Sequence, residues 1–290
     1  MPPGARDPRH SWAAAAQPRG PAVGATGGAI RVGGVKIGLV DSGIGLLAAA
    51  AAVRRARGDA DLVLASDPEG MPWGPRAPED VALRALACAR NAAAYGLDAL
   101  IVACNTASVH ALPALRAAFE PELPVVGTVP AIKPAAAAHR TVAIWATPAT
   151  TGSAYQRDLI AEFGNGAAIT EVPCPGLAHA VESADDAAVA AAVTAAAALT
   201  PPGVGAVVLG CTHYELVADR IRAAVPGAAL YGSADAVAAQ ALRRIGAEPA
   251  PAGAARGTLD VILGGRKGDL PATALAYSEG AALAKTSVTA

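Results

Sequence analysis

The sequence has few aromatic residues and almost no net charge, and both shortages restrict what the protein can be. Aromatic residues make up 3% of the 290 residues, while hydrophobic residues of all kinds make up 53%. We therefore expect a globular core of alanine and aliphatic side chains, in a chain long enough for two domains. The formal net charge is −1 and no five adjacent residues carry the same charge. Nucleic acid and anionic membranes are thus not expected partners, and a small molecule is the better expectation.

Long apolar segments are also missing. No stretch of about 18 apolar residues is free of glycine, proline and charge, as a membrane-spanning helix requires. The segment SWAAAAQPRG near the start is too short and too interrupted for a secretory signal. We therefore expect a cytoplasmic protein without a membrane partner.

Cysteine is scarce as well, with four widely spaced residues: Cys88, Cys104, Cys174 and Cys211. There is no CxxC motif and no Cys/His pairing at metal spacing, so no metal site is expected. In a reducing compartment all four should be free thiols. Cys88 lies in the helical run ALRALACARNAAA and is expected to be a small buried residue. Cys174, in EVPCPG, is expected to be structural, with a place in the lining of a cleft as the alternative.

The order of apolar segments indicates the fold class. Residues 1–34 are rich in Pro, Gly, Ala and Arg without periodicity, which predicts a disordered N-terminal extension. From Val35 onward, short β-rich runs such as VKIGLV and DLVLAS alternate with helical stretches near residues 44–57, 78–95 and 107–119. This alternation predicts an α/β fold, with a mostly parallel sheet covered by helices on both faces.

The pattern then restarts about one hundred residues later. TVAIWATP (141–148) resembles VKIGLVDS, and AVVLGCTH resembles LIVACNTA. Asp41 and Thr147 are 106 residues apart. The separation is 107 residues for two further pairs, Asp67 with Cys174 and Cys104 with Cys211. Such a constant offset predicts an internal duplication into two pseudo-symmetric, doubly wound halves. Ligands of open α/β sheets bind at the carboxyl ends of the strands, so both halves should face one shared cleft.

Cys104 and Cys211 would then face each other across that cleft. One thiolate can remove a proton from a carbon while the opposing thiol returns a proton to the other face, which inverts the carbon. A thiol pKa of roughly 8.5 allows both protonation states. Asp41 and His213, at the ends of neighbouring strands, are placed to tune the two sulfurs. Two alternatives stay open: buried structural cysteines, and a disulfide, which a reducing compartment opposes.

Together these motifs resemble glutamate racemase, of the cofactor-independent aspartate/glutamate racemase superfamily. The resemblance covers about residues 35–270 and rests on IGLVDSGIG, MPWG, LIVACNTAS, VVGTVPAIKPAA, ATPATTGSAY and VVLGCTHYEL, in this order. It implies a first α/β domain of residues 35–130 plus 232–290, a second of residues 131–231, and an active site in the cleft between them. It also implies a hinge motion around the substrate.

The resemblance further assigns roles to residues. Cys104 and Cys211 would be the catalytic acid–bases, with Asp41 and His213 as their respective partners. Glu182, in HAVESADD, would assist, although an exposed helix carboxylate is an equal alternative. The implied substrate-binding residues are Asp41, Ser42, Trp73, Gly74, Asn105, Thr106, Thr147, Thr150, Thr212 and His213. For Thr147 and Thr150 a turn that caps a helix is the alternative.

The implied reaction is the interconversion of L- and D-glutamate without a cofactor. The sequence has no GxGxxG fingerprint and no lysine in a Schiff-base context. By the same resemblance, D-glutamate would supply peptidoglycan in a bacterium, and a homodimer is the implied assembly. Trp73 stands where the family usually has tyrosine, and its indole keeps one donor. An aspartate or other amino-acid racemase is therefore the first alternative, and an idle paralogue that binds a small anion or a protein is the second.

Overall fold

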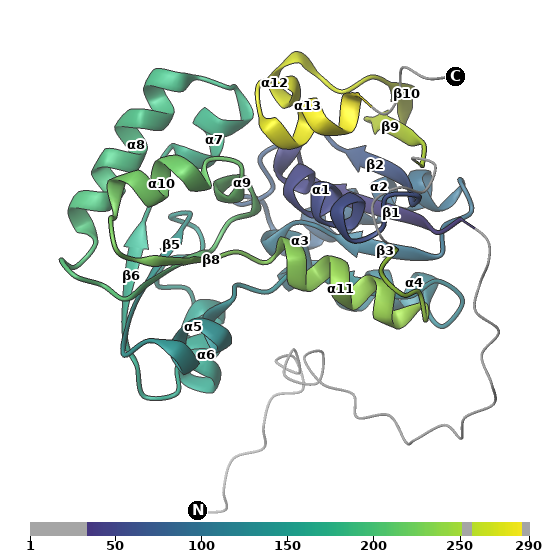
Figure 1. Ribbon diagram of the computed structural model, residues 1–290. Helices are drawn as coiled ribbons and strands as arrows, with labels where there is room; N and C mark the ends of the chain where they lie inside the picture. Colours follow the sequence, from purple (N-terminus) through teal and green to yellow (C-terminus); the bar gives the residue numbers. More distant parts are fainter. Residues whose placement is uncertain (1–33, 251–256, 286–290) are drawn as a thin grey trace, which may run out of the picture. The chain divides into compact units, whose positions relative to one another are not determined.

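The computed structural model describes residues 34–250 and 257–285. The predicted N-terminal extension therefore lies outside the described residues, apart from its last residue. Two separate β-sheets organise the described chain, and helices pack on both faces of each (Figure 1).

The first sheet has six strands in the order β10-β9-β2-β1-β3-β4. Only β10 runs antiparallel, against β9, and the other neighbouring strands are parallel. The strands are β1 (Lys36–Asp41), β2 (Asp61–Ser66), β3 (Ala99–Val102), β4 (Val125–Gly127), β9 (Leu259–Leu263) and β10 (Arg266–Gly268).

The second sheet has four parallel strands in the order β6-β5-β7-β8. Numbered along the chain, the four strands of this sheet are arranged second, first, third, fourth. The first four strands of the first sheet have the same arrangement, β2-β1-β3-β4. The strands are β5 (Thr141–Ala146), β6 (Ala168–Pro173), β7 (Ala206–Leu209) and β8 (Ala229–Tyr231). The predicted α/β class with two pseudo-symmetric, mostly parallel sheets is confirmed.

Helices cover both faces of each sheet, because the parallel strands are apolar on both sides. On the first sheet, Ile37 and Leu39 of β1 pack into the cluster that holds α1, α11 and α13, whereas Val40 packs into the cluster with α2 and α4. The helices of this half are the 3-10 turn η2 (Ile44–Leu46), α1 (Leu47–Ala56), α2 (Pro78–Ala93), α3 (Asn105–His110), α4 (Leu112–Phe119), α11 (Ala234–Arg244), α12 (Ala272–Leu275) and α13 (Ser278–Ala284).

On the second sheet, the apolar side chains of Trp145 and Val172 pack against α7, α8, α9 and α10. Helices α5 and α6 pack together on the other face, where α5 contacts β5 and β7. The helices of this half are α5 (Ile132–Ala138), α6 (Ala154–Phe163), α7 (Leu177–Glu182), α8 (Asp186–Leu199), α9 (Thr212–Glu215) and α10 (Ala218–Ala224).

Two predicted helices differ in detail from the observed ones. The segment predicted as one helix over 107–119 is divided into α3 and α4, because Pro113 has no N–H and its ring would clash with a carbonyl one turn earlier. Proline is tolerated in the first turn, where α4 places it. The helix predicted near 44–57 begins as the 3-10 turn η2, since Gly43 and Gly45 must fit against side chains of the second half.

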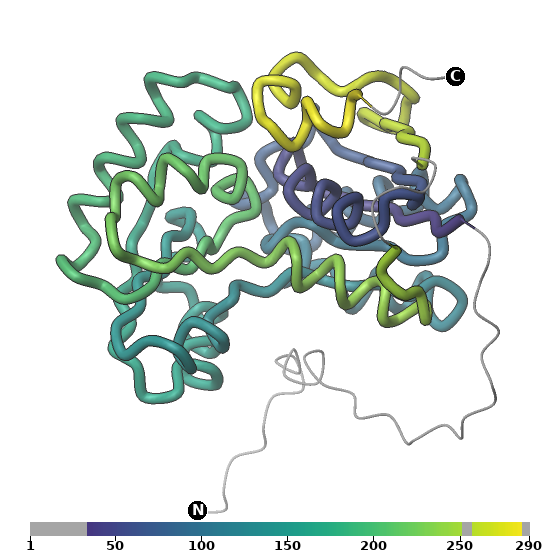
Figure 2. The backbone as a smooth tube through the Cα atoms, viewed as in Figure 1, coloured from purple at the N-terminus to yellow at the C-terminus, as the bar shows by residue number. Residues whose placement is uncertain are grey.

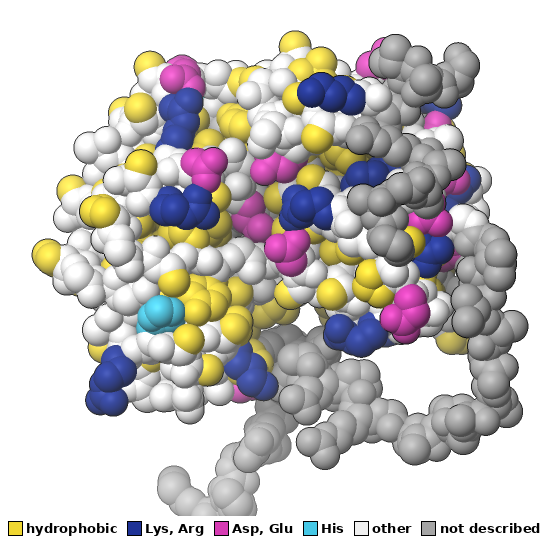
Figure 3. Space-filling model, in the orientation of Figure 1, with side chains coloured by type: hydrophobic (Ala, Val, Ile, Leu, Met, Phe, Trp, Pro, Cys, Tyr) yellow, Lys and Arg dark blue, Asp and Glu magenta, His cyan; other side chains and the backbone are white. Residues whose placement is uncertain are grey.

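The chain passes between the two sheets twice, from β4 to α5 and from β8 to α11, and both crossings can be followed in Figure 2. Within the described residues, no helix is long and apolar enough to span a membrane. On the face shown in Figure 3, the Lys and Arg side chains are interspersed with Asp and Glu.

Candidate active site

A cavity of about 300 Å³ lies at the carboxyl ends of the strands of both sheets. Both halves contribute to its lining, because the residues that directly follow β1, β3, β5, β6 and β7 form parts of the cavity wall. It contains every site residue predicted from the sequence: Asp41, Ser42, Trp73, Gly74, Cys104, Asn105, Thr106, Thr147, Thr150, Glu182, Cys211, Thr212 and His213.

The two thiols occupy equivalent positions in the two halves. Cys104 follows β3 and directly precedes α3, and Cys211 follows β7 and directly precedes α9. Their backbone angles are almost the same, with φ −139° and ψ 122° at Cys104 and φ −138° and ψ 136° at Cys211. All four cysteines are free, so the two thiols are not joined by a disulfide.

Asn105 joins the two cysteine loops. Its Nδ2 donates to the carbonyl of Gly210, immediately before Cys211, at 2.7 Å. This bond leaves Oδ1 of the same amide without a partner, although the side chain is buried and lines the cavity. A buried acceptor without a hydrogen bond is unfavourable, so Asn105 presents a place for a donor group of a ligand.

Asp41, the last residue of β1, has no exposed surface. Its Oδ1 accepts the backbone N–H of Ser42 at 2.6 Å, and Thr212 of the other half donates to its Oδ2 at 3.4 Å. The Cys104 thiol lies within hydrogen-bonding reach of the same carboxylate. Burial raises the pKa of Asp41 from 3.8 to about 6, although neighbouring His213 opposes the shift.

Burial also raises the pKa of the Cys104 thiol well above its usual value, and the Asp41 charge adds to the effect. Cys104 is therefore a neutral thiol in the ligand-free cavity at neutral pH. The Ala107 N–H acts in the opposite direction through a hydrogen bond to the sulfur.

His213 connects Cys211 to Glu182. Its Nδ1 lies 3.8 Å from the Cys211 sulfur, and its Nε2 lies 2.7 Å from Oε2 of Glu182. Burial by itself lowers the pKa of His213, but the hydrogen bonds to Cys211 and Glu182 and the negative charge of Asp41 outweigh it and raise that pKa well above 6.5. These contacts favour the positively charged form of the imidazole beside Cys211.

Glu182 is the last residue of α7, and its side chain is 17% exposed. Besides the His213 contact, its Oε2 accepts the backbone N–H of Ile44 from the first half at 2.9 Å. A Cβ atom at Gly43 would overlap this carboxylate. Glu182 is thus a fixed group in the cavity wall and not the exposed helix carboxylate of the alternative.

Trp73 is buried and lines the cavity, but its indole nitrogen does not face a ligand. Nε1 donates to Oδ2 of Asp67 at 3.1 Å, and Arg84 donates to the same oxygen at 3.0 Å. The indole does donate one hydrogen bond, as expected, but to Asp67 and not into the cavity. The loop presents an aromatic ring to the cavity, and its side-chain donor is already bonded within the protein.

Thr147 and Thr150 are bonded to each other, with their hydroxyl oxygens 3.2 Å apart. The cap of the following helix α6 is Ser153, whose Oγ accepts the N–H of Gln156. The two threonines thus lie in the strand-to-helix turn of the alternative, in which Ser153 and not a threonine is the N-cap, and both residues also line the cavity.

Several further lining residues were not selected from the sequence. Cys174 lines the cavity, as its alternative reading stated, and burial raises its pKa to about 12. His179 lies three residues before Glu182 on α7 and so shares its face, a spacing visible in HAVE. Met71 and Pro72 join the wall next to Trp73.

Within the described part of the chain, no cluster of His, Cys, Asp and Glu could hold a metal ion.

Comparisons with known proteins agree with this geometry. A model of the Asp/Glu/hydantoin racemase family matches residues 44–241. The glutamate racemase of Roseiflexus sp. (strain RS-1) is 40% identical over 195 residues, which cover 64% of this chain and 70% of the relative. A glutamate racemase of Pseudomonas putida is 35% identical over 230 residues, which cover 76% of this chain and 86% of the relative.

Among solved structures, Escherichia coli glutamate racemase in complex with L-glutamate and the activator UDP-MurNAc-Ala is similar, with a TM-score of 0.72 and 27% identity. The match covers 84% of this chain and 92% of the E. coli chain. The resemblance to glutamate racemases is confirmed. Since the family model matches more than half of the chain, the protein belongs to the Asp/Glu/hydantoin racemase family.

Proposed function

We propose that the protein is a glutamate racemase that interconverts L- and D-glutamate by two-base proton transfer between Cys104 and Cys211. One observation carries the proposal: the two thiols stand at equivalent strand ends of two similar sheets, on one cavity, and each has its own acid–base partner. The glutamate racemases among the relatives support glutamate as the substrate.

The two thiols start in different protonation environments. Cys104 carries its proton and offers it toward Asp41, whereas His213 can accept the proton of Cys211 and place a positive charge beside the sulfur. In one direction, the Cys211 thiolate removes the α-proton of the substrate and Cys104 returns a proton to the other face. In the opposite direction, Asp41 accepts the Cys104 proton, and the sulfur then serves as the base.

Between the two transfers, the electron pair of the broken C–H bond is delocalised into the α-carboxylate, which becomes more negative. Fixed donors stabilise this charge better than water does, because they need no reorganisation during the reaction. Hydroxyl and amide donors around the cavity are suited to the two carboxylates of glutamate: Ser42, Thr106, Thr147, Thr150 and Thr212, with the backbone of Gly74. The unpaired Oδ1 of Asn105 is suited to the ammonium group.

The test is α-proton exchange of L-glutamate and of L-aspartate in deuterated water, followed by NMR and chiral analysis of the products. We expect exchange of glutamate with D-glutamate as product. Cys104→Ser and Cys211→Ser should each lower kcat at least about a thousandfold, because a serine hydroxyl is a far weaker acid than a thiol. Exchange of aspartate alone would replace the substrate assignment. No exchange of either would contradict the proposal and favour a binding role for the cavity.

The cellular setting and the assembly are proposals as well. D-Glutamate would supply peptidoglycan in a bacterium, and the enzyme would act in the cytoplasm as a homodimer. Light scattering coupled to gel filtration tests the dimer, and a monomer mass at micromolar concentration would contradict it. The division into domains of residues 35–130 plus 232–290 and residues 131–231 is supported by the two sheets, since β1 to β4, β9 and β10 form one and β5 to β8 the other.

A further inference from the structure

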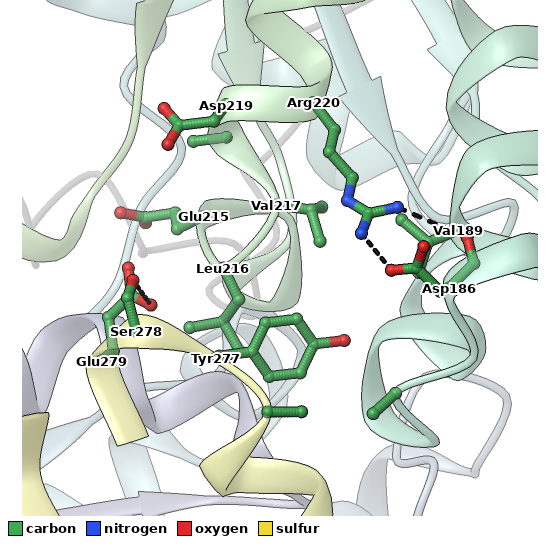
Figure 4. Close-up of a pocket in the computed structure, with 13 residues that line it drawn as sticks. Asp186, Val189, Glu215, Leu216, Val217, Asp219, Arg220, Tyr277, Ser278 and Glu279 are labelled. Carbon is green, nitrogen blue, oxygen red and sulfur yellow. Dashed lines mark hydrogen bonds and ion pairs between the residues drawn. The ribbon is translucent and has the colours of Figure 1, made fainter. Parts of the chain in front are cut away.

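The segment between α12 and α13 contacts both halves of the described chain. Helix α13 packs against α1 of the first half. Tyr277, which precedes α13, packs against the apolar clusters of both sheets, as does Leu216 after α9. Figure 4 shows the Tyr277 ring beside Leu216, at the edge of a pocket of about 310 Å³ that also contains the Asp186–Arg220 ion pair.

The hydroxyl of Tyr277 donates to the carbonyl oxygen of Val181 at 2.6 Å. That carbonyl and the N–H of Glu182 belong to the same planar peptide unit, so the bond fixes the plane from which the Glu182 side chain begins. Helix α7 ends there, and Ala184, two residues on, has a left-handed φ of 52°. The turn after α7 supplies one further donor to the same carbonyl, the N–H of Ala184 at 3.1 Å, so Tyr277 is the contact that ties this helix end to the first half.

The other end of Glu182 is held from the first half too. Its carboxylate accepts the N–H of Ile44 and contacts Nε2 of His213. The position of this carboxylate is therefore set at two points, by Ile44 at the oxygen and by Tyr277 at the peptide. A shift of the peptide would lengthen the 2.7 Å contact to His213, which in turn stands 3.8 Å from the Cys211 sulfur.

We propose that Tyr277 is a positioning residue that holds Glu182 against His213 and so supports proton transfer at Cys211, on the condition that the proposed racemase function holds. Tyr277 touches neither the cavity nor the reacting atoms, and it acts through the Val181 peptide. Its effect should therefore fall on one of the two thiols. Among the described residues, no hydrogen bond joins Asp41, the partner of Cys104, to Tyr277, Val181 or Glu182, and Asp41 is instead bonded to Thr212 and lies near the charge of His213.

Tyr277→Phe removes the hydroxyl and keeps the ring. The fold should persist, because the side chain is half-buried and the Val181 carbonyl keeps the hydrogen bond from the Ala184 N–H. We expect kcat to fall about three- to tenfold, the usual effect of one hydrogen bond, with little change in KM. The matched control is Tyr231→Phe, which removes a hydroxyl bonded to His139 at 3.0 Å outside the cavity and should leave kcat unchanged.

The deciding measurement is the primary deuterium isotope effect on kcat/KM with α-deuterated L- and D-glutamate. Each enantiomer gives its proton to a different thiol, so slower transfer at Cys211 should raise the isotope effect for one enantiomer and lower it for the other. Glu182→Gln should shift the isotope effect of each enantiomer in the same direction as Tyr277→Phe does, and by a larger amount. If Tyr277→Phe lowers both rates equally with unchanged isotope effects, or changes nothing, the proposal is wrong and Tyr277 only anchors α13.

A second readout does not depend on turnover. The imidazole of His213 can be titrated by NMR in the ligand-free protein, with its signal assigned from its loss in His213→Gln. We expect a lower pKa in Tyr277→Phe than in the wild type, and no change in Tyr231→Phe, since a looser Glu182 stabilises the imidazolium less. An unchanged His213 titration would overturn the proposal. If the wild type racemises neither amino acid, the proposed function fails while this titration still decides the role of Tyr277.

Discussion

At the scale of single residues, the carboxyl group of Asp41 lies in a buried position where its ionisation is unfavourable. Asp41 is fully buried, and its pKa is raised to about 6 mainly because water is excluded. A carboxyl group with a pKa near 6 can exchange protons with a thiol at neutral pH more readily than an exposed aspartate can. The same burial makes the folded state less stable when the group is charged.

Asp41→Asn should therefore stabilise the protein at high pH. The pKa of Asp41 is higher in the folded chain than in the unfolded chain, so stability is lost as pH rises from 3.8 through about 6. Above that range we expect the variant to be more stable than the wild type by about 1–3 kcal/mol, a difference that shrinks toward pH 4. Urea unfolding between pH 4 and 8 measures it.

The control for this prediction is Asp235→Asn, at a side chain that is 85% exposed. Its difference from the wild type should stay within about 0.5 kcal/mol at each pH. A lower stability of Asp41→Asn at every pH would show that the Asp41 carboxylate stabilises the fold.

At the scale of elements, the short helix α7 brings a carboxylate of the second half against the first half. This contact requires glycine at position 43, because any side chain there would overlap the Glu182 carboxylate. Gly45 is restricted in the same way, since its Cβ would lie 2.5 Å from Oδ2 of Asp41. Glycine at position 45 of η2 and at position 43 just before it thus leaves room for groups of both halves to meet at this turn.

Gly43→Ala should consequently impair catalysis more than folding. A Cβ atom at position 43 would overlap the carboxylate of Glu182, so the methyl group should displace this carboxylate from His213. We expect kcat to fall about 10- to 100-fold with a small change in Tm. Gly58→Ala, at a position with open space around the added methyl group, is the control and should keep full activity. Normal kcat in Gly43→Ala would mean that Glu182 does not need this position.

At the scale of the whole described chain, the halves are joined by two crossings and by hydrogen bonds around the cavity. The bonds run from Asn105 to Gly210, from Ile44 to Glu182 and from Thr212 to Asp41. Cys104 is 7% exposed and Asp41 is not exposed at all. Cys104 and Asp41 are thus almost closed off from solvent, and we expect the halves to move apart when substrate enters, with the crossings at β4 to α5 and β8 to α11 as the places where the chain bends.

Binding of glutamate should accordingly stabilise the closed arrangement. We expect a smaller radius of gyration by small-angle X-ray scattering, and slower amide hydrogen exchange at Ile44 and at the Asn105 loop, when L-glutamate saturates the protein. L-Lysine at the same concentration is the control, since its side-chain cation does not match the donors of the cavity. Scattering and exchange that do not respond to glutamate would rule out the hinge motion.

Sequence patterns were sufficient to predict the fold class, the internal repeat and the residues at the ends of the strands. The alternation of apolar runs and helical stretches predicted the α/β fold, and the constant offset between Cys104 and Cys211 predicted two similar sheets with the thiols at equivalent strand ends. The motifs IGLVDSGIG, LIVACNTAS and VVLGCTHYEL pointed to Asp41, Asn105 and His213 respectively, because a strand end and the loop after it are continuous in sequence.

Contacts between distant segments were decided by the tertiary structure alone. The N–H of Ile44 reaches the Glu182 carboxylate across 138 residues, and Tyr277 reaches the peptide before Glu182 across 96 residues. No periodicity encodes such partners, since each depends on how separately formed elements pack. The sequence determined which groups stand at the ends of the strands, and packing decided which of them meet, because hydrogen bonds and burial depend on distances that only the folded chain has.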